Sequence, residues 1–245
     1  MSTTPTTNLL ELKGVHTHIG AYHILHGVDL AVPKGQLTML LGRNGAGKTT
    51  TLRTIMGLWQ ASQGRISFNG QDITKKHTPQ IADLGIAYVP ENMGIFADLT
   101  VKENMLLAAR KASHAGQMDQ ARLEWIFKLF PAVEKFWNHP AGKLSGGQKQ
   151  MLAVSRAIVE PRDLLIVDEP SKGLAPAIIN NMINAFDQLK KSGVTILLVE
   201  QNINFAKRLG DTVAVMDNGQ VVHAGSMAAL AQDEELQRSL LGLAL

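Results

Sequence analysis

The chain has 245 residues, 45% of them hydrophobic, no cysteine and a formal net charge of +3. This length predicts one domain, or one domain with an inserted subdomain, and no apolar run approaches the roughly 20 residues that span a bilayer. The absence of cysteine excludes disulfide and thiolate chemistry and fits the cytosol. The weak charge, without a basic cluster, argues against nucleic-acid binding. Residues 1–8 lack the basic and apolar regions of a secretory signal, so we expect a short disordered lead-in.

The first part of the chain is predicted to form a small antiparallel sheet. Apolar and polar residues alternate over residues 9–19 and 24–32, as in half-buried strands. Residues 64–72 carry an Asn69–Gly70 turn and are also predicted to belong to this sheet. We expect this sheet to wrap around the segment between its strands.

That segment carries a predicted phosphate-binding loop. The apolar run 37–41 precedes the sequence GRNGAGKT, and residues 50–58 have helical spacing. This is the strand, glycine-rich loop and helix in which G-x-x-x-x-G-K-[ST] binds phosphate through backbone N–H groups and the start of a helix. Lys48 is expected to reach the β- and γ-phosphates, and Thr49 to bind Mg²⁺. The predicted nucleotide-binding residues here are Gly42, Arg43, Asn44, Gly45, Ala46, Gly47, Lys48, Thr49 and Thr50.

Residues 93–160 have a different character, because β-branched runs thin out and helix-compatible stretches dominate. We interpret them as a helical subdomain inserted in the sheet domain. Five of the ten Phe and Trp residues of the chain cluster there: Trp125, Phe127, Phe130, Phe136 and Trp137. Their simplest role is the core of that subdomain, with a partner-docking surface as the alternative.

A second anion-binding helix start is predicted at LSGGQ, ahead of a helix over residues 149–160. Ser145 is suited to cap the helix, while Gly146 and Gly147 expose backbone N–H groups and Gln148 follows them. This motif has no lysine of its own. A plain Ser-Gly-Gly cap is the alternative.

The apolar runs 164–167, 194–199 and 212–216 join residues 37–41 as predicted strands of a mostly parallel sheet covered by helices. Asp168 and Glu169 end the first of these runs, at the sheet edge where open α/β folds bind ligands. Asp168 is expected to hold Mg²⁺, and Glu169 to orient and deprotonate the attacking water. An isolated Asp-Glu pair would equally suit a surface turn. Asn218–Gly219 predicts a terminal hairpin, and Ser226 is expected to cap a helical tail.

Over residues 8–240 the chain resembles the nucleotide-binding subunits of ATP-binding cassette (ABC) transporters, because it carries GRNGAGKT, LSGGQ and LLIVDEP in this order. The resemblance implies an α/β fold: a RecA-like P-loop core with an antiparallel β subdomain (residues 8–92 and 161–225), an inserted α-helical subdomain (93–160) and a helical tail (226–245). It also implies a head-to-tail dimer in which the LSGGQ segment of one subunit closes over ATP held by the loop of the other.

Three further segments, VPE at 89–91, DEPSKGLAP at 168–176 and LVEQN at 198–202, look like one of the two ATPase subunits of branched-chain amino-acid importers. Glu91, another expected metal ligand, stands where most of the family has glutamine. Gln201 replaces a histidine that contacts the γ-phosphate, and Ala175 replaces an aspartate. Ile19 aligns with the aromatic residue that stacks on adenine. Tyr22 is the candidate to replace it, with an ordinary strand tyrosine as the alternative.

These features predict an ATPase that powers a transporter at the cytoplasmic face of the inner membrane. Glu169, Gln201 and Lys48 are the expected catalytic residues, and ATP and Mg²⁺ the ligands. The implied partners are membrane permease subunits, a second cassette (a heterodimer, with a homodimer as the alternative) and, indirectly, a periplasmic solute-binding protein. A nucleotide-gated regulatory module with weak ATPase, and a cassette ATPase outside transport, are the rival hypotheses.

Overall fold

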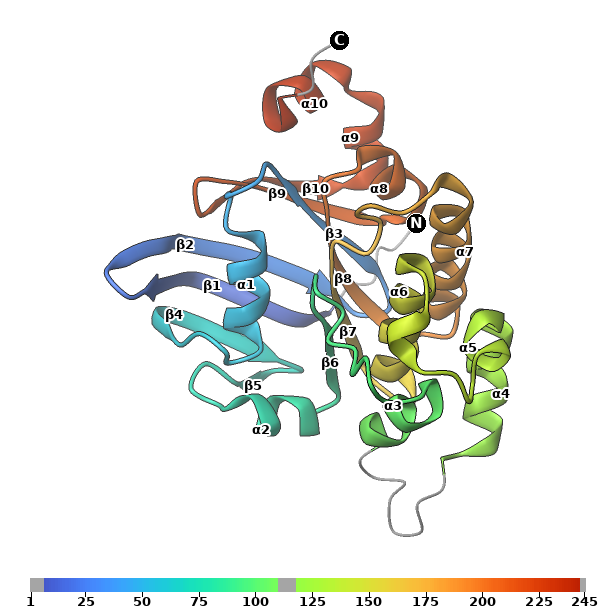
Figure 1. The fold of residues 1–245 in the computed structure, drawn as a ribbon. Helices are drawn as coiled ribbons and strands as arrows, with labels where there is room; N and C mark the ends of the chain where they lie inside the picture. The colour runs from blue at the N-terminus through green and yellow to red at the C-terminus, as the bar shows by residue number, and fades with distance from the viewer. Residues whose placement is uncertain (1–6, 110–117, 243–245) are drawn as a thin grey trace.

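The computed structural model of the chain describes residues 7–109 and 118–242. Within them, two β-sheets and a set of helices pack into layers (Figure 1). Parts of three predicted segments lie outside the described residues: the start of the lead-in, residues 110–117 of the helical region and residues 243–245 of the tail. None of the helices described is long and apolar enough to cross a membrane.

The antiparallel sheet has the strand order β2-β1-β4-β5. Its strands are β1 (Asn8–Ile19), β2 (Tyr22–Pro33), β4 (Ala61–Phe68) and β5 (Gln71–Asp72). The predicted strands are confirmed, and β4 begins three residues earlier than expected. Asn69 and Gly70 connect β4 to β5 with φ angles of 47° and 77°, the positive φ pair that a tight hairpin turn of this kind requires.

The larger sheet has the order β10-β9-β3-β8-β7-β6. Its strands are β3 (Leu37–Gly42), β6 (Ile86–Val89), β7 (Leu164–Asp168), β8 (Thr195–Glu200), β9 (Thr212–Asp217) and β10 (Gln220–Ser226). All neighbours pair in parallel except β9 and β10, which form the predicted terminal hairpin. The edge strand β6 was not predicted, because its four residues are too few to show a period.

Both faces of this sheet are buried, which explains its continuous apolar strands. Leu198 packs into a core with helices on one face, and its neighbour Leu197 packs into a second core on the other. The expectation that helices cover the sheet is correct for the first face only. The second face is covered by α1 (Lys48–Ile55) together with the antiparallel sheet, whose buried leucines and valines share that core.

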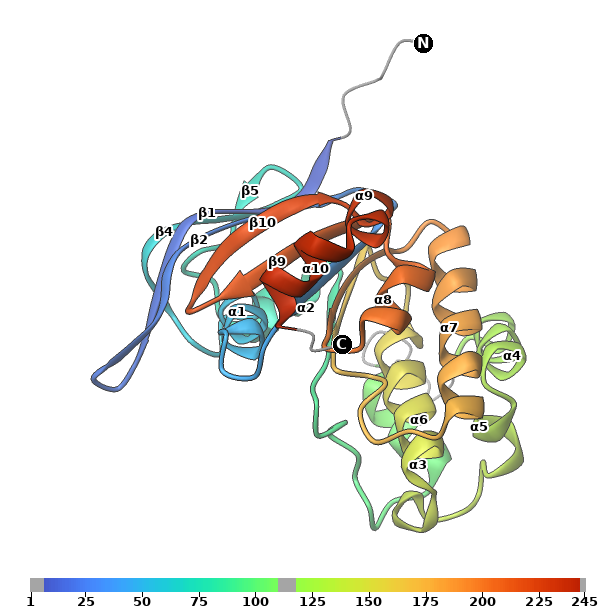
Figure 2. The ribbon, with the colours of Figure 1, turned by 90° about the horizontal axis from the view of Figure 1, so that it is seen from above.

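The helices of the first face lie together on one side of the central sheet in Figure 2. Between β6 and β7 the chain forms α3 (Val101–Ala108), α4 (Gln120–Leu129), α5 (Pro131–Lys135), the short 3-10 helix Ala141–Lys143 and α6 (Gly146–Ile158). The later helices α7 (Pro176–Lys191) and α8 (Ile203–Leu209) complete this layer. Phe130 is fully buried, and the other four clustered aromatic residues pack against the same core, as the core interpretation predicted.

Two smaller helical units complete the fold. The helix α2 (Thr78–Asp83) precedes β6 and buries Ile81. At the end of the chain, α9 (Met227–Gln232) and α10 (Glu234–Leu241) form the predicted tail. Ser226 caps α9 by accepting a hydrogen bond from the Ala229 N–H, as its sequence position predicted.

Candidate functional site

The glycine-rich loop lies between the end of β3 and the start of α1, at the carboxyl edge of the parallel sheet. Gly42 and Gly47 have φ angles of 148° and 103°, and Gly47 is the N-cap of α1. A Cβ on Gly42 would lie 2.3 Å from the Met216 carbonyl oxygen. Only glycine therefore fits this position, and the loop can present its backbone N–H groups at the start of the helix.

A cavity of about 320 Å³ opens against this loop. Its lining residues are Ile24, Asn44, Gly45, Gly47, Lys48, Thr49, Thr50, Glu91, Glu169 and Lys172. Five of them belong to the predicted phosphate loop. The structure thus brings the loop together with one predicted catalytic carboxylate and with Glu91.

Lys48 lies folded into the loop. Its Nζ donates to the backbone carbonyl oxygens of Gly42 and Arg43, at 2.9 and 3.0 Å, and lies 3.9 Å from Glu169 Oε1. Burial lowers the pKa of Lys48 from its usual value, and the carboxylates of Glu169 and Asp168 oppose that shift. The ammonium is thus held at the loop, next to the cavity, by carbonyl oxygens that a phosphate would replace as partners.

Asp168 ends β7 and is 1% exposed. Within the described part of the chain, neither of its carboxylate oxygens has a hydrogen-bond partner. Burial raises its pKa to about 6, and the charges of Glu169 and Glu91 act in the same direction, while the nearby Thr49 side chain opposes them. An orphaned buried carboxylate next to a threonine hydroxyl matches the hard oxygen donors that Mg²⁺ prefers.

Within the described residues, the side chains alone do not supply a complete metal site. Among the residues that the structure describes, no three His, Cys, Asp or Glu side chains are grouped to hold a metal ion. Glu91, predicted as a metal ligand, instead pairs with Lys172 at 2.6 Å. This fits Mg²⁺, which usually takes one or two protein carboxylates and completes its shell with phosphate oxygens and water.

Glu169 follows Asp168 in a left-handed backbone conformation, with φ 48°. Its two carboxylate oxygens have different partners: Oε1 accepts a hydrogen bond from Gln201 Nε2 at 2.5 Å, and Oε2 lies 3.3 Å from Lys172 Nζ. Gln201, predicted as a catalytic residue at the position of the family's histidine, binds the candidate base in this structure. Both partners leave the carboxylate facing the cavity that it lines.

Glu200 was missed by the sequence analysis. This residue ends β8 and is 2% exposed, and burial raises the pKa of its carboxyl group. Its carboxylate oxygens accept hydrogen bonds from backbone N–H groups in two loops of the site. The N···O distances are 2.9 Å for Ser171, 3.2 Å for Gln201 and 3.3 Å for Asn202. The sequence did carry a sign of this residue, because Glu200 is an acidic residue at the end of an apolar strand, as Asp168 is.

Other predicted ligands do not line the cavity: Gly42, Arg43 and Ala46 of the loop, Tyr22, and the LSGGQ segment. Tyr22, at the tip of the β1–β2 hairpin, is 76% exposed, and Ile24 of the same hairpin lines the cavity. The LSGGQ segment begins α6, where Ser145 and Gln148 form a reciprocal capping box. Ser145 and Gly146 are exposed, Gly147 is buried against Ile178, and none of the four lines the cavity.

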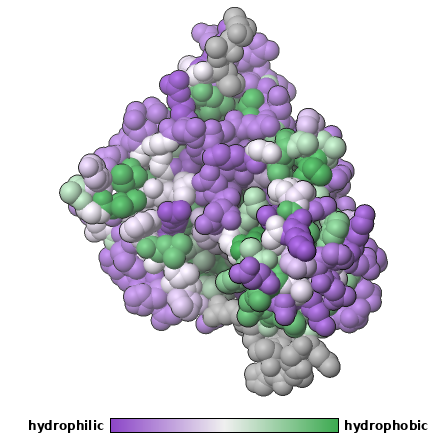
Figure 3. Space-filling model, in the orientation of Figure 1, coloured by the Kyte–Doolittle hydropathy of each residue, from purple (hydrophilic) through white to green (hydrophobic). Residues whose placement is uncertain are grey.

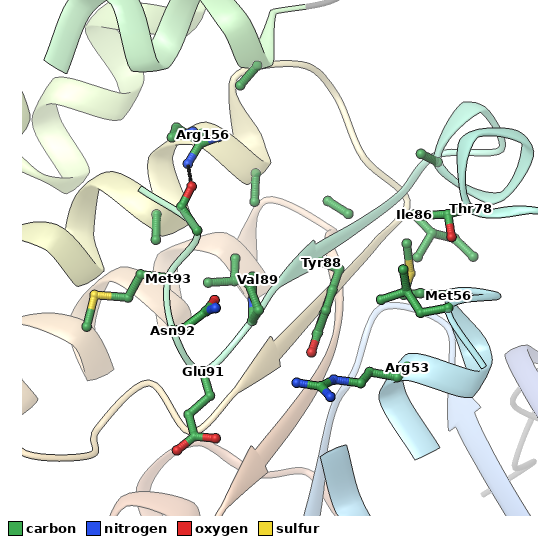
Figure 4. Close-up of a pocket in the computed structure, with 18 of the residues that line it drawn as sticks. Arg53, Met56, Thr78, Ile86, Tyr88, Val89, Glu91, Asn92, Met93 and Arg156 are labelled. Atoms are coloured by element: carbon green, nitrogen blue, oxygen red, sulfur yellow. Dashed lines mark hydrogen bonds between the residues drawn. The ribbon is translucent and has the colours of Figure 1, made fainter. Parts of the chain in front are cut away.

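A larger groove of about 1030 Å³ lies beside the nucleotide cavity, between the α1–α2 region and α6. Its lining includes Tyr88, Met93 and Arg156, and Glu91 lines both the groove and the cavity. In Figure 4 the Glu91 side chain points away from Arg156. The segment after β6 therefore separates the two spaces and contacts both.

The wall of the groove is held by two polar residues. Arg156 of α6 donates a hydrogen bond to the carbonyl oxygen of Gly94, drawn as the dashed line in Figure 4. Its guanidinium group also lies over the Phe96 ring, 5.1 Å from the ring centroid. The fully buried Asn104 of α3 exchanges hydrogen bonds with the backbone of Phe96, at 2.9 and 3.1 Å, and also donates to Thr100. The segment 94–100 is thus fastened to the helical layer rather than to the sheet.

Comparison with known proteins assigns this arrangement to a family. The family described as ABC transporter matches residues 25–172. The chain is 38% identical to the high-affinity branched-chain amino acid transport ATP-binding protein BraG of Pseudomonas aeruginosa, covering 96% of this chain and all of that one. It is 36% identical to the probable branched-chain amino acid transport ATP-binding protein LivF of Archaeoglobus fulgidus, covering 90% and 93% of the two chains.

Solved structures agree. A nucleotide-free cassette from an ABC transporter superposes with a TM-score of 0.81 at 25% identity, covering 98% of this chain and all of that one. A cassette in its ADP conformation gives 0.80 at 26% identity, covering 97% and 100%. With the phosphate loop, the Asp168–Glu169 pair and the α/β core all in place, the chain belongs to the ABC transporter family, as an ATP-binding cassette ATPase.

Proposed function

We propose that this subunit hydrolyses MgATP at the cavity between the phosphate loop and Glu169, and that it does so to drive import of a small solute. The observation that carries the proposal is the convergence of Lys48, Glu169 and Glu91 on one cavity beside the orphaned carboxylate of Asp168. The proposed nucleotide-binding domain spans residues 8–240, with residues 93–160 as its helical subdomain.

Each residue has a distinct part in the proposed mechanism. The loop N–H groups and Lys48 bind the β- and γ-phosphates. Thr49 and Asp168 would hold Mg²⁺, which neutralises charge on the phosphates, and Glu91 would join them through Oε2, the oxygen that is not paired with Lys172. Glu169 orients the attacking water and accepts its proton at a carboxylate oxygen. Gln201 holds that carboxylate and, being neutral, adds no positive charge to the transition state.

The proposed site is completed by a second cassette. Residues 145–148 lie outside the cavity of their own chain, and Ser145 and Gly146 present an exposed helix start. A head-to-tail dimer would bring this helix start to the nucleotide held by the partner, as anion binding at a helix N-terminus requires. Because Gln201 carries no charge, we propose a heterodimer with a companion that bears a cationic residue there.

The groove is the proposed docking site for a membrane permease subunit. Its lining combines apolar side chains with the charged Arg53, Arg156 and Arg162. Leu107, next to the lining residue Ala108, is 56% exposed, and Phe96, whose ring contacts Arg156, is 49% exposed. Figure 3 shows hydrophobic side chains in the region of α3, as one of several such patches on this face. A peripheral position at the cytoplasmic side of the membrane follows from such docking. The relatives named for branched-chain amino acid transport support these amino acids, or similar small molecules, as the solute.

A regulatory module that binds ATP without hydrolysing it is the second candidate, favoured by the neutral Gln201. The retained Glu169, held by Gln201 and Lys172, argues against it, because a binding-only site has no use for a positioned base.

The test follows the mass of the purified chain in solution, with and without MgATP, alongside phosphate release. The native protein is compared with Glu169→Gln, which keeps the shape of the side chain and removes the base. We expect the native protein to release phosphate and the variant to bind ATP, lose at least about a hundredfold in rate and accumulate as a dimer. Equal phosphate release by both proteins would overturn the assignment of Glu169. If neither protein hydrolyses or dimerises, the site needs the companion cassette.

A further inference from the structure

Lys172 is the one charged residue lining the nucleotide cavity, within the described ranges, that the mechanism above leaves without a part. It lies three residues after Glu169, in the turn between β7 and α7. Its Nζ lies 2.6 Å from Glu91 Oε1 and 3.3 Å from Glu169 Oε2. One ammonium group is thus shared by two carboxylates that come from different loops.

These contacts contribute little to the stability of the fold. The side chains of Lys172 and Glu91 are 59% and 46% exposed, and exposed ion pairs contribute at most about 1 kcal/mol. Their consequence is the placement of the two carboxylates relative to each other. Without the ammonium, Glu91 and Glu169 would be two like charges facing one cavity and would repel each other.

The ammonium also completes the fixation of Glu169. Gln201 holds Oε1 of the carboxylate, and Lys172 lies against Oε2, so both oxygens of the candidate base are restrained. A general base acts only when it is held within hydrogen-bond reach of the proton that it accepts. Of these two partners, Lys172 is the one that also contacts Glu91, in the segment after β6.

The segment after β6 is the wall of the groove. Glu91 begins the segment whose far end is held by Arg156 through the Gly94 carbonyl oxygen. The chain of contacts runs from Arg156 through Gly94 and Glu91 to Lys172 and ends at Glu169. These contacts form one continuous path from the groove wall to the candidate base.

We infer that Lys172 is a positioning residue that joins Glu169 to the Glu91 segment, so that the groove wall and the general base move together. This inference rests on the proposed hydrolysis for its catalytic consequence, but the link itself exists in the nucleotide-free protein. Lys172→Met removes the charge at nearly constant length, and Lys172→Arg keeps it. Lys207→Met, at an exposed lysine of α8, is the matched control.

The first measurement is amide hydrogen exchange on the nucleotide-free proteins. The Met93 N–H bonds to the Pro90 carbonyl oxygen and the Gly94 N–H to that of Asn92, both at 2.8 Å, next to Glu91. We expect Lys172→Met to speed exchange at these two amides by about threefold or more. Lys172→Arg and Lys207→Met should match the native protein.

The second measurement is single-turnover ATP hydrolysis at excess protein, with Glu169→Gln as the baseline. We expect Lys172→Met to lower the rate about tenfold, with half-saturation by ATP within about twofold of native, because ground-state binding is unchanged. Lys172→Arg should recover most of the rate.

Unchanged exchange at Met93 and Gly94 overturns the link, whatever happens to the rate. Faster exchange with a native rate overturns the positioning role. A rate loss that arises from weaker ATP binding does the same. If the native protein hydrolyses nothing even with its companion cassette present, the proposed function fails, and the exchange comparison alone still decides the link.

Discussion

Asp168 and Glu169 are adjacent in the chain, but their carboxylates meet different surroundings. Asp168 closes a buried strand and has no hydrogen-bond partner among the described residues, whereas Glu169 turns into the cavity and contacts Gln201, Lys172 and Lys48. The left-handed backbone of Glu169 separates the two side chains. Two chemically similar acids thus become a candidate metal ligand and a candidate base.

The first prediction concerns Asp168. Its pKa is raised to about 6 in the folded protein, so folding favours the protonated form. Below pH 4 the group is protonated in both states; as pH rises through 6 the folded state acquires a buried charge and loses about 3 kcal/mol. We expect Asp168→Asn to raise the Tm of the nucleotide-free protein by several degrees at pH 8, and by less at pH 5.

Calorimetry in metal-free buffer at both pH values makes this comparison. Asp187→Asn, at a partly exposed aspartate of α7, is the control and should leave the Tm nearly unchanged. A lower Tm for Asp168→Asn at pH 8, or the same gain at both values, would show that burial does not dominate at Asp168. The variant should also lose the thermal stabilisation that MgATP gives the native protein.

At the scale of elements, two helices begin with the same device but face different surroundings. Thr100 caps α3 and Ser145 caps α6, each in a reciprocal capping box. The start of α3 is tied to the strand-like segment at Pro140 by a bridge, whereas Ser145 and Gly146 are exposed. The two caps therefore share one local motif but differ in the helix start that they leave exposed.

The second prediction uses this pair. Ser145→Ala and Thr100→Ala should each destabilise the protein by about 1 kcal/mol, as the loss of a helix cap does. In the Glu169→Gln background, only Ser145→Ala should prevent the dimer that ATP traps, because only that helix start is proposed to contact the nucleotide of the partner. Mass in solution and thermal denaturation separate the two effects. Equal loss of the dimer in both variants would mean that destabilisation alone accounts for it.

The elements themselves differ in how well sequence predicted them. Continuous apolar runs identified β3, β7, β8 and β9, because strands buried on both faces need no polar alternation. The short strand β6 was not predicted, because the run IAYV at residues 86–89 is too short to show a period. The sequence also could not say that the antiparallel sheet would cover one face of the central sheet, because amphipathic strands show that a face is buried but not against what.

At the scale of the molecule, two cavities share one segment. The smaller lies against the phosphate loop, the larger between the α1–α2 region and α6, and Glu91 lines both. The segment after β6 is fastened to the helical layer by Arg156 and Asn104. Any partner that fills the groove would therefore act on a backbone connected to the nucleotide cavity.

The third prediction tests the groove as a docking surface. Leu107→Asp places a charge at a 56% exposed apolar residue of α3 and should abolish association with the membrane subunits, while ATP binding remains native. Val222→Asp, at a 50% exposed residue of β10 far along the sheet, is the matched control. Co-purification from membranes that contain the complete transporter gives the readout. Normal association of Leu107→Asp would exclude this part of the surface.

The sequence by itself determined the chemistry of the phosphate site and the order of the main elements. The spacing of glycines, Lys48 and Thr49 is local, and a strand–loop–helix unit folds those residues into one loop wherever it occurs. The acidic pair Asp168 and Glu169, at the end of a buried strand, could also be predicted from the sequence.

Only the tertiary structure decided which distant side chains meet. Glu91, Lys172 and Gln201 come from three loops at the ends of β6, β7 and β8, and parallel pairing of those strands brings the loops to one edge. The partners of Glu169, the role of the buried Glu200 and the exposure of Tyr22 all depend on that register. Sequence periodicity reports burial along one element, whereas contacts between elements depend on how their ends align in space.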